Sequence, residues 1–222
     1  MNEDCIYSDV CQQECSSSCI RYLESSYLLE HSNIPKAKQK RYKLEPERCD
    51  VQAFKRLANI QKKITTFVEE NNSLYLYSAT CGNGKTTWSI KLMLQYFNEV
   101  WAGNGFRRRG LFINAPTFLS KCKEVMDYPD KNFEAMRRDI PNVDFLIFDD
   151  MIVSKMSNYD YSTLLNYADQ RIFNEKTTIY TGNVPPENLS EFVGDRLASR
   201  ICSGYTIELK GQDRRYGNIT DN

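Results

Sequence analysis

A glycine-rich segment between an apolar run and a helical pattern carries the most specific chemistry in this chain. It reads ATCGNGKTT, residues 79–87. In a phosphate-binding loop, consecutive backbone N–H groups surround the phosphates, a lysine reaches the terminal phosphates, and a hydroxyl binds Mg²⁺ at the start of the next helix. The pattern therefore predicts a site for ATP and Mg²⁺. We expect phosphate contacts from Cys81, Gly82, Asn83, Gly84, Lys85, Thr86 and Thr87.

The first position of such a loop is normally glycine, and here it is Ala79. Alanine fits if the backbone keeps a negative φ, because only a positive φ makes its Cβ costly. The sequence leaves this angle open. A glycine-rich turn between a strand and a helix, without a ligand, is the plainer interpretation of the segment.

A second motif, VDFLIFDD at residues 143–150, ends in two aspartates. A short, mostly apolar run suits a strand that is buried on both faces of a parallel sheet. At the end of this strand, Asp149 is placed to complete a Mg²⁺ site with Thr86, and Asp150 occupies the position that polarises the attacking water. The alternative is a pair of strand-end carboxylates that begin a turn.

The elements that hold these residues alternate between strands and helices. The apolar patterns predict strands at 74–79, 111–114, 143–150, 177–183 and 204–211, and helices at 51–67, 86–101, 161–174 and 186–201, the last in one or two pieces. This alternation predicts a doubly wound α/β fold, a parallel sheet flanked by helices, with the active loops at the carboxyl ends of the strands.

With 222 residues, of which 41% are hydrophobic, the chain suits one domain and a small appendage. We expect a cysteine-rich module at residues 1–32, a basic linker at 33–49 and the α/β domain at 50–222. Lys+Arg and Asp+Glu number 29 each, so contacts with nucleic acid would come from local patches. The acidic first residues and the lack of an apolar run of about 18 residues predict a cytoplasmic protein without a membrane partner.

Four of the eight cysteines lie near the amino end, at Cys5, Cys11, Cys15 and Cys19. Clustered cysteines in a reducing compartment favour metal over disulfide. Four thiolates on one Zn²⁺ lie within roughly 4 Å of one another, whereas a straight helix would separate Cys11 from Cys19 by about 12 Å. The helix would therefore have to break, for which the serines at 16–18 are suited. A cysteine-rich tail without metal is the alternative, and His31 is a less favoured ligand.

Five motifs follow one another between about residues 50 and 216: SATCGNGKTT, FLIFDD, TTIYTGNVPPENL, GDRLASRI and KGQDRR. In this order they resemble AAA+ helicase loaders of the DnaC/DnaI type, notably phage-encoded replication ATPases. The resemblance implies an AAA+ P-loop NTPase fold with ATP hydrolysis and a replicative helicase as partner. It also implies binding of single-stranded DNA and self-association through nucleotide sites. A phage-encoded protein of this kind would act in the host cytoplasm.

The resemblance also implies roles for single residues. Asn183 is similar to the sensor that orients water and the γ-phosphate, and Arg200 to the arginine finger that reaches a neighbouring subunit, with Arg196 less favoured. Arg215 resembles the second sensor arginine, and Arg214 is its near alternative. A finger supplied in trans raises the rate by about 10³ to 10⁵, so an isolated protomer would be a poor ATPase.

Many AAA+ proteins have glutamate where this chain has Asp150, and the shorter side chain favours slow hydrolysis. Three further arginines, Arg107, Arg108 and Arg109, lie in the turn after the loop helix. They are candidates for contacts with the phosphates of single-stranded DNA, or they form a solvated turn.

These observations predict an ATPase that loads a replicative helicase onto single-stranded DNA. A transposition helper ATPase of the same superfamily has the same motifs. Asp150 also leaves a further alternative, a nucleotide-gated adaptor that binds ATP with little turnover. A small-molecule P-loop kinase is less favoured for two reasons. The position of Arg200 resembles that of an arginine that acts on a neighbouring subunit, and the sequence shows no lid for binding a phosphate acceptor.

The zinc hypothesis is tested by metal analysis of the purified protein. Some loaders of the type that this chain resembles carry a zinc-binding amino-terminal domain that contacts the helicase. A metal contributing about 10 kcal/mol or more would explain how a module of this size folds. We expect one Zn²⁺ per chain on Cys5, Cys11, Cys15 and Cys19, and protein without stoichiometric zinc would contradict the hypothesis.

Overall fold

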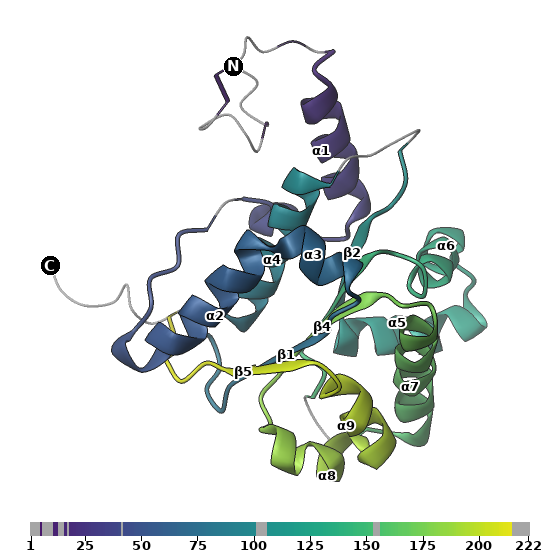
Figure 1. Cartoon of the computed structure of the whole chain (residues 1–222). Helices are drawn as coiled ribbons and strands as arrows, with labels where there is room; N and C mark the ends of the chain where they lie inside the picture. The colour runs from purple at the N-terminus through teal and green to yellow at the C-terminus, as the bar shows by residue number, and fades with distance from the viewer. Residues whose placement is uncertain are drawn as a thin grey trace, which may run out of the picture.

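The computed structural model describes residues 5, 11–12, 16, 18–40, 42–100, 106–152 and 156–214. A five-stranded sheet forms the centre, with strand order β2-β3-β4-β1-β5 and parallel pairing throughout (Figure 1). The strands are β1 (Leu74–Tyr77), β2 (Gly110–Asn114), β3 (Phe145–Asp149), β4 (Thr177–Gly182) and β5 (Tyr205–Glu208). The predicted α/β class is confirmed.

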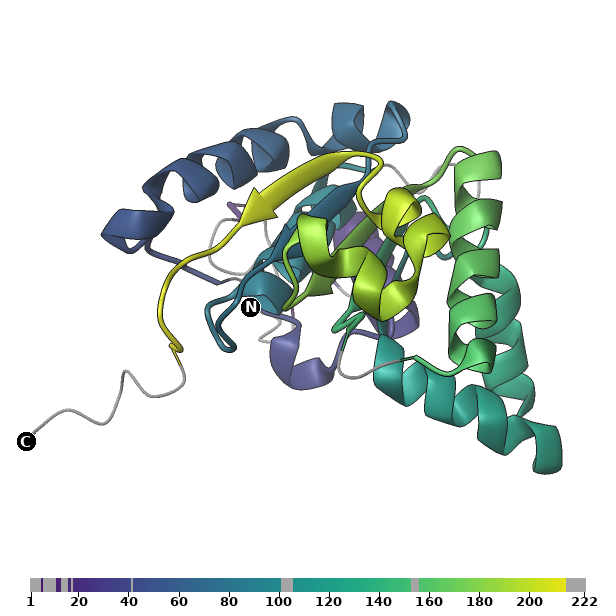
Figure 2. The same cartoon turned by 90° about the horizontal axis from the view of Figure 1, so that it is seen from below.

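Helices cover both faces of the sheet (Figures 1 and 2). One face packs against α1 (Ile20–His31), α2 (Val51–Lys62), α3 (Ile64–Glu69) and α4 (Lys85–Glu99). The other packs against α5 (Ala115–Asp127), α6 (Lys131–Asp139), α7 (Asn158–Phe173), α8 (Leu189–Val193) and α9 (Asp195–Ile201). Short 3₁₀ helices span Lys36–Lys38, Arg48–Asp50 and Pro186–Asn188. Successive strand residues point to opposite faces of the sheet. Leu74 and Leu76 therefore pack in the hydrophobic cluster on one face, and Tyr75 packs in the cluster on the other.

Two helices between β2 and β3, α5 and α6, are absent from the elements that the sequence patterns predict. Their start signals are ordinary ones. The Asn114 side chain accepts a hydrogen bond from Thr117 N at 3.3 Å, and Asp130 Oδ1 accepts from Asn132 N and Phe133 N at 3.0 and 3.1 Å. An Asn or Asp at the N-cap is what helix starts prefer, so these two residues were the signal that could have revealed both helices.

The helix predicted at 51–67 is divided in two at Lys63, whose φ of −120° and ψ of 35° are not helical. The apolar face nevertheless continues across the break, because Ile60, Ile64 and Phe67 are all buried. Apolar spacing alone cannot reveal such a break, since the same residues face the core on both sides of it.

The segment from α1 to Ile34 packs onto the α/β core. Leu28, Leu29 and Ile34 are buried in the same cluster as the residues of α2 and α4. The outer edge of β2 is also covered, because Phe112 N donates to Ser32 O at 2.7 Å and Asn33 Nδ2 donates to Phe112 O at 3.0 Å. The amino-terminal module that we predict for residues 1–32 is thus continuous with the α/β core from α1 onward.

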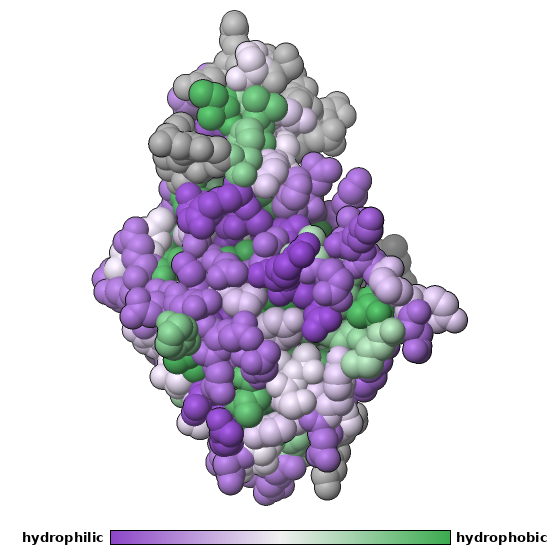
Figure 3. Space-filling model, turned by 90° about the vertical axis from the view of Figure 1, so that its right-hand side faces the viewer, coloured by the Kyte–Doolittle hydropathy of each residue, from purple (hydrophilic) through white to green (hydrophobic). Residues whose placement is uncertain are grey.

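Most of the face shown in Figure 3 is hydrophilic, with a small apolar group over α1 near the top. Ile20 and Leu23 of this helix are 62% and 43% exposed. Among the helices that the structure describes, none is long and apolar enough to cross a membrane.

Candidate nucleotide-binding site

The glycine-rich loop connects β1 to α4, and Lys85 is the first residue of that helix. Two glycines give the loop its shape, because φ is +70° at Gly82 and +105° at Gly84. Ala79 is not one of the described residues with positive φ, which outside glycine are Asn33, Asn71, Asp150 and Glu175. The alanine therefore occupies an ordinary backbone conformation, and the loop does not need glycine at this position.

Polar side chains hold the loop together from within. Asn83, 1% exposed, donates through Nδ2 to Ser78 Oγ and, at 3.0 Å, to Leu209 O. Lys85, 6% exposed, donates through Nζ to Thr80 O at 3.0 Å. The ammonium group thus lies in the loop and meets a backbone oxygen where phosphate oxygens are expected to bind.

The other predicted loop contacts are less enclosed. Cys81 is exposed, and Thr87, in the first turn of α4, is half-buried. The thiol of Cys81 is free of a disulfide.

Thr86 and Asp149, the two residues that we predict to hold Mg²⁺, lie in direct contact. Thr86 Oγ1 donates to Asp149 Oδ1 at 2.8 Å, and Thr181 Oγ1 donates to the same oxygen at 2.8 Å. Asp149 is 3% exposed, and burial raises the pKa of its carboxyl, with a further contribution from the negative charge of Asp150. The two hydroxyl hydrogen bonds act in the opposite direction because they stabilise the ionised form.

Sequence reasoning did not identify Thr181 as a site residue. It lies near the carboxyl end of β4, beside β3, which carries Asp149. Because the strands are parallel, the ends of β3 and β4 meet at the same edge of the sheet. A hydroxyl residue at that point of the run TTIYTGN was the available signal.

Asp150 follows β3 with a φ of 55°, in the left-handed region that non-glycine residues seldom adopt. Its backbone N donates to Thr181 Oγ1 at 2.9 Å, and Met151 N donates to Thr181 O at 2.9 Å. These bonds fix the sharp turn at the end of β3. A strained conformation held by its surroundings is typical of functional sites.

Asn183 follows β4 directly. Its Oδ1 is buried and has no hydrogen-bond partner among the described residues. Leaving a buried acceptor without a donor costs free energy, which a bound water or ligand would relieve. With Lys85 in the loop and Thr86 on Asp149, this unsatisfied acceptor makes the residues present compatible with ATP and Mg²⁺.

A strap formed by residues 209–214 runs along the loop. Thr80 Oγ1 donates to Gly211 O at 2.8 Å, and Arg214 N donates to Gly82 O at 3.1 Å. The Asp213 side chain lies so close to Gly82 that a Cβ added there would overlap it. Gly82 is thus favoured for its positive φ, and any larger residue there would also displace the Asp213 side chain.

The other side of the strap is held by the segment before α2. Asp50, 0% exposed, accepts from Lys210 N at 2.6 Å and from Gly211 N at 3.0 Å. Arg214 Nη2 donates to Glu45 O at 2.8 Å. Arg215, predicted as the second sensor, lies outside the described residues, as does Cys15.

The predicted arginine finger is not part of the loop cluster. On α9, Arg200 Nε donates to Asp169 Oδ1 on α7 at 2.8 Å, and Arg196 Nη2 lies 3.8 Å from Asp169 Oδ2. The Arg200 side chain is 35% exposed and the Arg196 side chain 67%. One surface aspartate therefore holds both candidate arginines.

Arg107, Arg108 and Arg109 each have an acidic partner within the chain. Arg107 and Arg109 pair with Asp144 at 3.2 and 2.9 Å, and Arg108 pairs with Asp139 at 2.6 Å. They directly precede β2, so they lie at the amino ends of the strands, whereas the loop lies at the carboxyl ends. These pairs give the arginines a structural role, and DNA binding by them stays a prediction.

No group of three His, Cys, Asp or Glu side chains that could hold a metal occurs among the described residues. Cys5 and Cys19 are half-buried and Cys11 is exposed. Because Cys15 is outside the described part of the chain, the zinc hypothesis also stays a prediction.

The phosphate-type loop, the aspartate at the end of β3 and the strand order together define a P-loop NTPase fold of the AAA+ class. Residues 47–208 match the family described as bacterial DnaA ATPase domain, and the chain belongs to this family.

Similar proteins agree with this assignment. The replicative helicase loader DnaC of Escherichia coli strain K12 is 24% identical over 152 residues, which cover 67% of this chain and 59% of that protein. The chain therefore matches 59% of the length of this curated relative. A crystal structure of the DnaC helicase loader has a TM-score of 0.62 at 20% identity and covers 75% of this chain and 94% of the other.

A third similar structure is DnaA from Aquifex aeolicus bound to AMPPCP. It has a TM-score of 0.60 at 17% identity and covers 79% of this chain and 51% of the other. At these identities the solved structures establish the fold. The predicted resemblance to AAA+ loaders of the DnaC/DnaI type is confirmed.

Replacing Ala79 by glycine should lower the free energy of unfolding by about 0.5–1 kcal/mol, because glycine adds freedom to the unfolded chain without relieving strain. ATP affinity should stay within about twofold. Gly84→Ala is the matched comparison, since φ there is +105° and no neighbour lies within 4 Å of the added Cβ. That variant should bind ATP more weakly. Tighter binding by Ala79→Gly, measured by calorimetry, would contradict the assigned backbone conformation.

Replacing Asp149 by asparagine should raise the melting temperature at neutral pH without Mg²⁺ by about 2–4 °C, the shift that about 1 kcal/mol produces in a chain of this size. Burial raises the folded-state pKa of this carboxyl above its unfolded value, so the folded protein binds the proton more tightly. The destabilisation by the ionised group therefore exists above the folded pKa and disappears as the pH falls through it.

The advantage of the Asp149→Asn variant should accordingly shrink on acidification, which thermal unfolding at pH 7 and pH 5 would detect. The exposed Asp127 of α5 serves as control, because Asp127→Asn removes a carboxylate without changing burial. An Asp149→Asn protein that melts lower than wild type at both values would show that the ionised carboxylate stabilises the fold.

Proposed function

We propose that this protein is an ATPase that loads a replicative DNA helicase onto single-stranded DNA. The observation that carries the nucleotide part is the meeting of Thr86 and Thr181 on the buried Asp149 beside the phosphate-type loop. The helicase part is supported by family membership and by similarity to proteins described as helicase loaders.

In this proposal Lys85 binds the terminal phosphates, and Thr86 with Asp149 holds the Mg²⁺. Bound Mg²⁺ and ATP supply the reactive phosphoryl group and neutralise its charge. Asp150 and Asn183 position the attacking water, for which Asn183 Oδ1 is an unsatisfied acceptor. The short side chain of Asp150 on a strained backbone favours slow hydrolysis.

Assembly completes the site. Arg200 is on α9, where Asp169 holds it on the surface, and we propose that it acts on the nucleotide of a neighbouring subunit. An exposed ion pair of this kind is weak, so the arginine can exchange Asp169 for a phosphate at little cost. Hydrolysis would then depend on protein concentration and on the partner.

A nucleotide-gated adaptor with little turnover is the second candidate, and the conformation of Asp150 is the observation in its favour. The two candidates share ATP binding and the helicase partner, and they differ in whether the partner and DNA stimulate hydrolysis.

The test combines co-purification with the replicative helicase and ATPase assays on the full chain. Wild type should retain the helicase in the presence of ATP and hydrolyse ATP faster with rising protein concentration or with single-stranded DNA. Lys85→Ala should lose ATP binding because the cation that faces the phosphates is gone. Arg200→Ala should bind ATP normally but lose stimulated hydrolysis by about 10³-fold. Arg138→Ala removes an exposed arginine on α6 and serves as control.

Recovery of a transposase and no helicase would transfer the protein to the transposition helpers. ATP binding and helicase retention without any stimulated hydrolysis would favour the adaptor. Hydrolysis that is independent of concentration, DNA and partner, with phosphate transfer to a metabolite, would reject the proposal in favour of a kinase.

A further inference from the structure

The two edges of the sheet differ in how they are covered. On β2, Phe112 exchanges hydrogen bonds with Ser32 and Asn33. At the opposite edge, β5 pairs with β1 and is the outermost of the described strands. Figure 2 shows β5 at this edge with α2 running alongside.

The backbone of β5 presents hydrogen-bonding groups outward over a short stretch. Tyr205 N donates to Ser73 O and Leu209 N to Tyr77 O, both at 2.8 Å, so these residues face β1. Because the direction alternates along a strand, the N–H and C=O groups of Thr206 and Glu208 face away from β1. Lys210, next in this alternation, donates its N–H to Asp50. The open stretch therefore ends where the strap begins.

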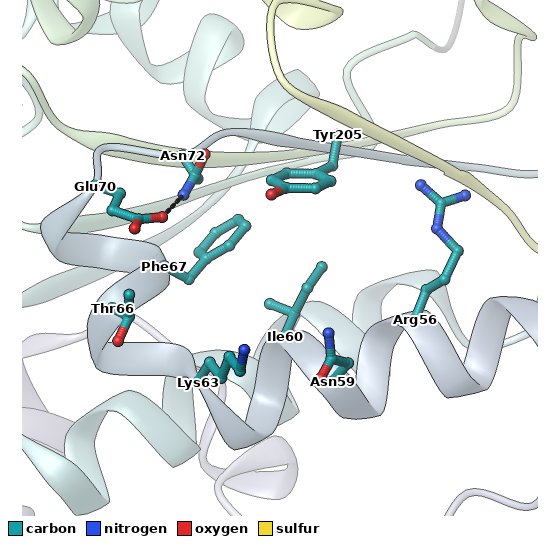
Figure 4. Close-up of a pocket in the computed structure, with 9 residues that line it drawn as sticks. All are labelled: Arg56, Asn59, Ile60, Lys63, Thr66, Phe67, Glu70, Asn72 and Tyr205. Atoms are coloured by element: carbon teal, nitrogen blue, oxygen red, sulfur yellow. Dashed lines mark hydrogen bonds between the residues drawn. The ribbon is translucent and has the colours of Figure 1, made fainter.

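A cavity of about 200 Å³ lies beside this open stretch, between α2, α3 and β5 (Figure 4). Its apolar part consists of Ile60, Phe67 and Tyr205, and the rings of Phe67 and Tyr205 are 5.8 Å apart. Tyr205 is 46% exposed although it begins a strand. In Figure 4, Arg56 extends from α2 toward β5, and Lys63 lies farther along the same wall. A cavity of this size accepts one apolar side chain.

The helix beside the groove has an unbalanced charge. Residues 51–63 contain four cations and no Asp or Glu. The cations are Lys55, Arg56, Lys62 and Lys63. All four are exposed, and none forms an ion pair with a described residue. Of these four, Arg56 and Lys63 line the cavity, where Glu70 is the only acidic side chain among the described lining residues. The cavity lining therefore has a small excess of positive charge, which complements an acidic ligand.

We propose that the open edge of β5 and the cavity beside it form a docking groove for an extended acidic segment of a partner protein. The segment pairs with Thr206 and Glu208 as an added strand, places one apolar side chain against Phe67 and Tyr205, and directs its carboxylates to Arg56 and Lys63. Strand addition supplies affinity through the main chain and specificity through the cavity.

The groove favours a peptide over a nucleic acid. The outward N–H and C=O groups of Thr206 and Glu208 match the alternation of a peptide backbone, and a sugar-phosphate backbone offers no such alternating donors and acceptors. Tyr205 lies at the amino end of β5, whereas the nucleotide loop is at the carboxyl ends of the strands. The cavity is therefore separate from the proposed ATP site, although the open edge of β5 ends at the strap, and the docking groove goes beyond the proposed activity.

The test uses the full chain and an array of octapeptides in which Asp or Glu alternates with one apolar residue. The tightest peptide is then measured by fluorescence anisotropy. Arg56→Ala with Lys63→Ala should weaken its binding about tenfold, because two exposed charge pairs are lost. Tyr205→Ala should weaken it as well. The matched control, Lys131→Ala with Arg138→Ala, removes one exposed lysine and one exposed arginine from α6 and should have no effect.

Two further readouts separate strand addition from simple charge attraction. The amides of Thr206 and Glu208 should exchange more slowly with solvent when the peptide is bound. A peptide with N-methylated alternate amides should lose most of its affinity. No binder in the array, equal loss in the α6 control, or unchanged exchange at Thr206 and Glu208 would overturn the proposal. Tighter binding of an oligothymidylate at the same groove would overturn it in favour of nucleic acid.

Discussion

The buried carboxylate of Asp149 is the constraint around which the nucleotide site is organised. Hydroxyl groups from two other elements, Thr86 on α4 and Thr181 on β4, donate to a single oxygen of this residue. A carboxylate inside a protein is costly unless hydrogen bonds or a cation compensate. The same contacts therefore stabilise the charge and fix the distance between the loop helix, β3 and β4. A divalent cation at this place would relieve the remaining cost, so the geometry is compatible with the magnesium role that we propose.

A second buried carboxylate, Asp50, acts at the outer end of the site. It accepts two backbone N–H groups of the strap, and the strap in turn contacts the loop through Gly211 and Arg214. Asp50 directly precedes α2 and follows the basic segment that leads from α1. A continuous set of hydrogen bonds thus connects the phosphate-type loop to the amino-terminal part of the chain. Any change of loop conformation on nucleotide binding would act on these bonds first.

Much of the fold is predictable because apolar runs and phosphate-loop spacing are local signals. The strands β1 and β3 are short, mostly apolar runs, β4 is rich in β-branched residues, and the loop motif locates the start of α4. The helices α5 and α6 went unpredicted because their start signals were single N-cap residues. The break at Lys63 was also missed, because burial continues on both sides of it. In the site, the sequence predicts that Thr86 and Asp149 share a Mg²⁺ ion, but it does not indicate Thr181, since the role of Thr181 depends on strand order.

Arg171 shows the same limit. In the sequence nothing distinguishes this arginine from other charged residues of a helix. In the fold it is 0% exposed and donates to Ile140 O and Val143 O, at 2.6 and 3.0 Å. Only the packing of α7 against the turn before β3 brings those carbonyl groups together.

The sequence by itself determined the α/β class, the phosphate-type loop and the order of the motifs, because each depends on residue types at short spacing. Tertiary structure alone decided the rest. It decided that Ala79 has a negative φ, that Asp213 lies against Gly82, and that one edge of the sheet stays open beside a cationic helix. These features depend on which distant segments meet in space, and local patterns carry no information about such meetings.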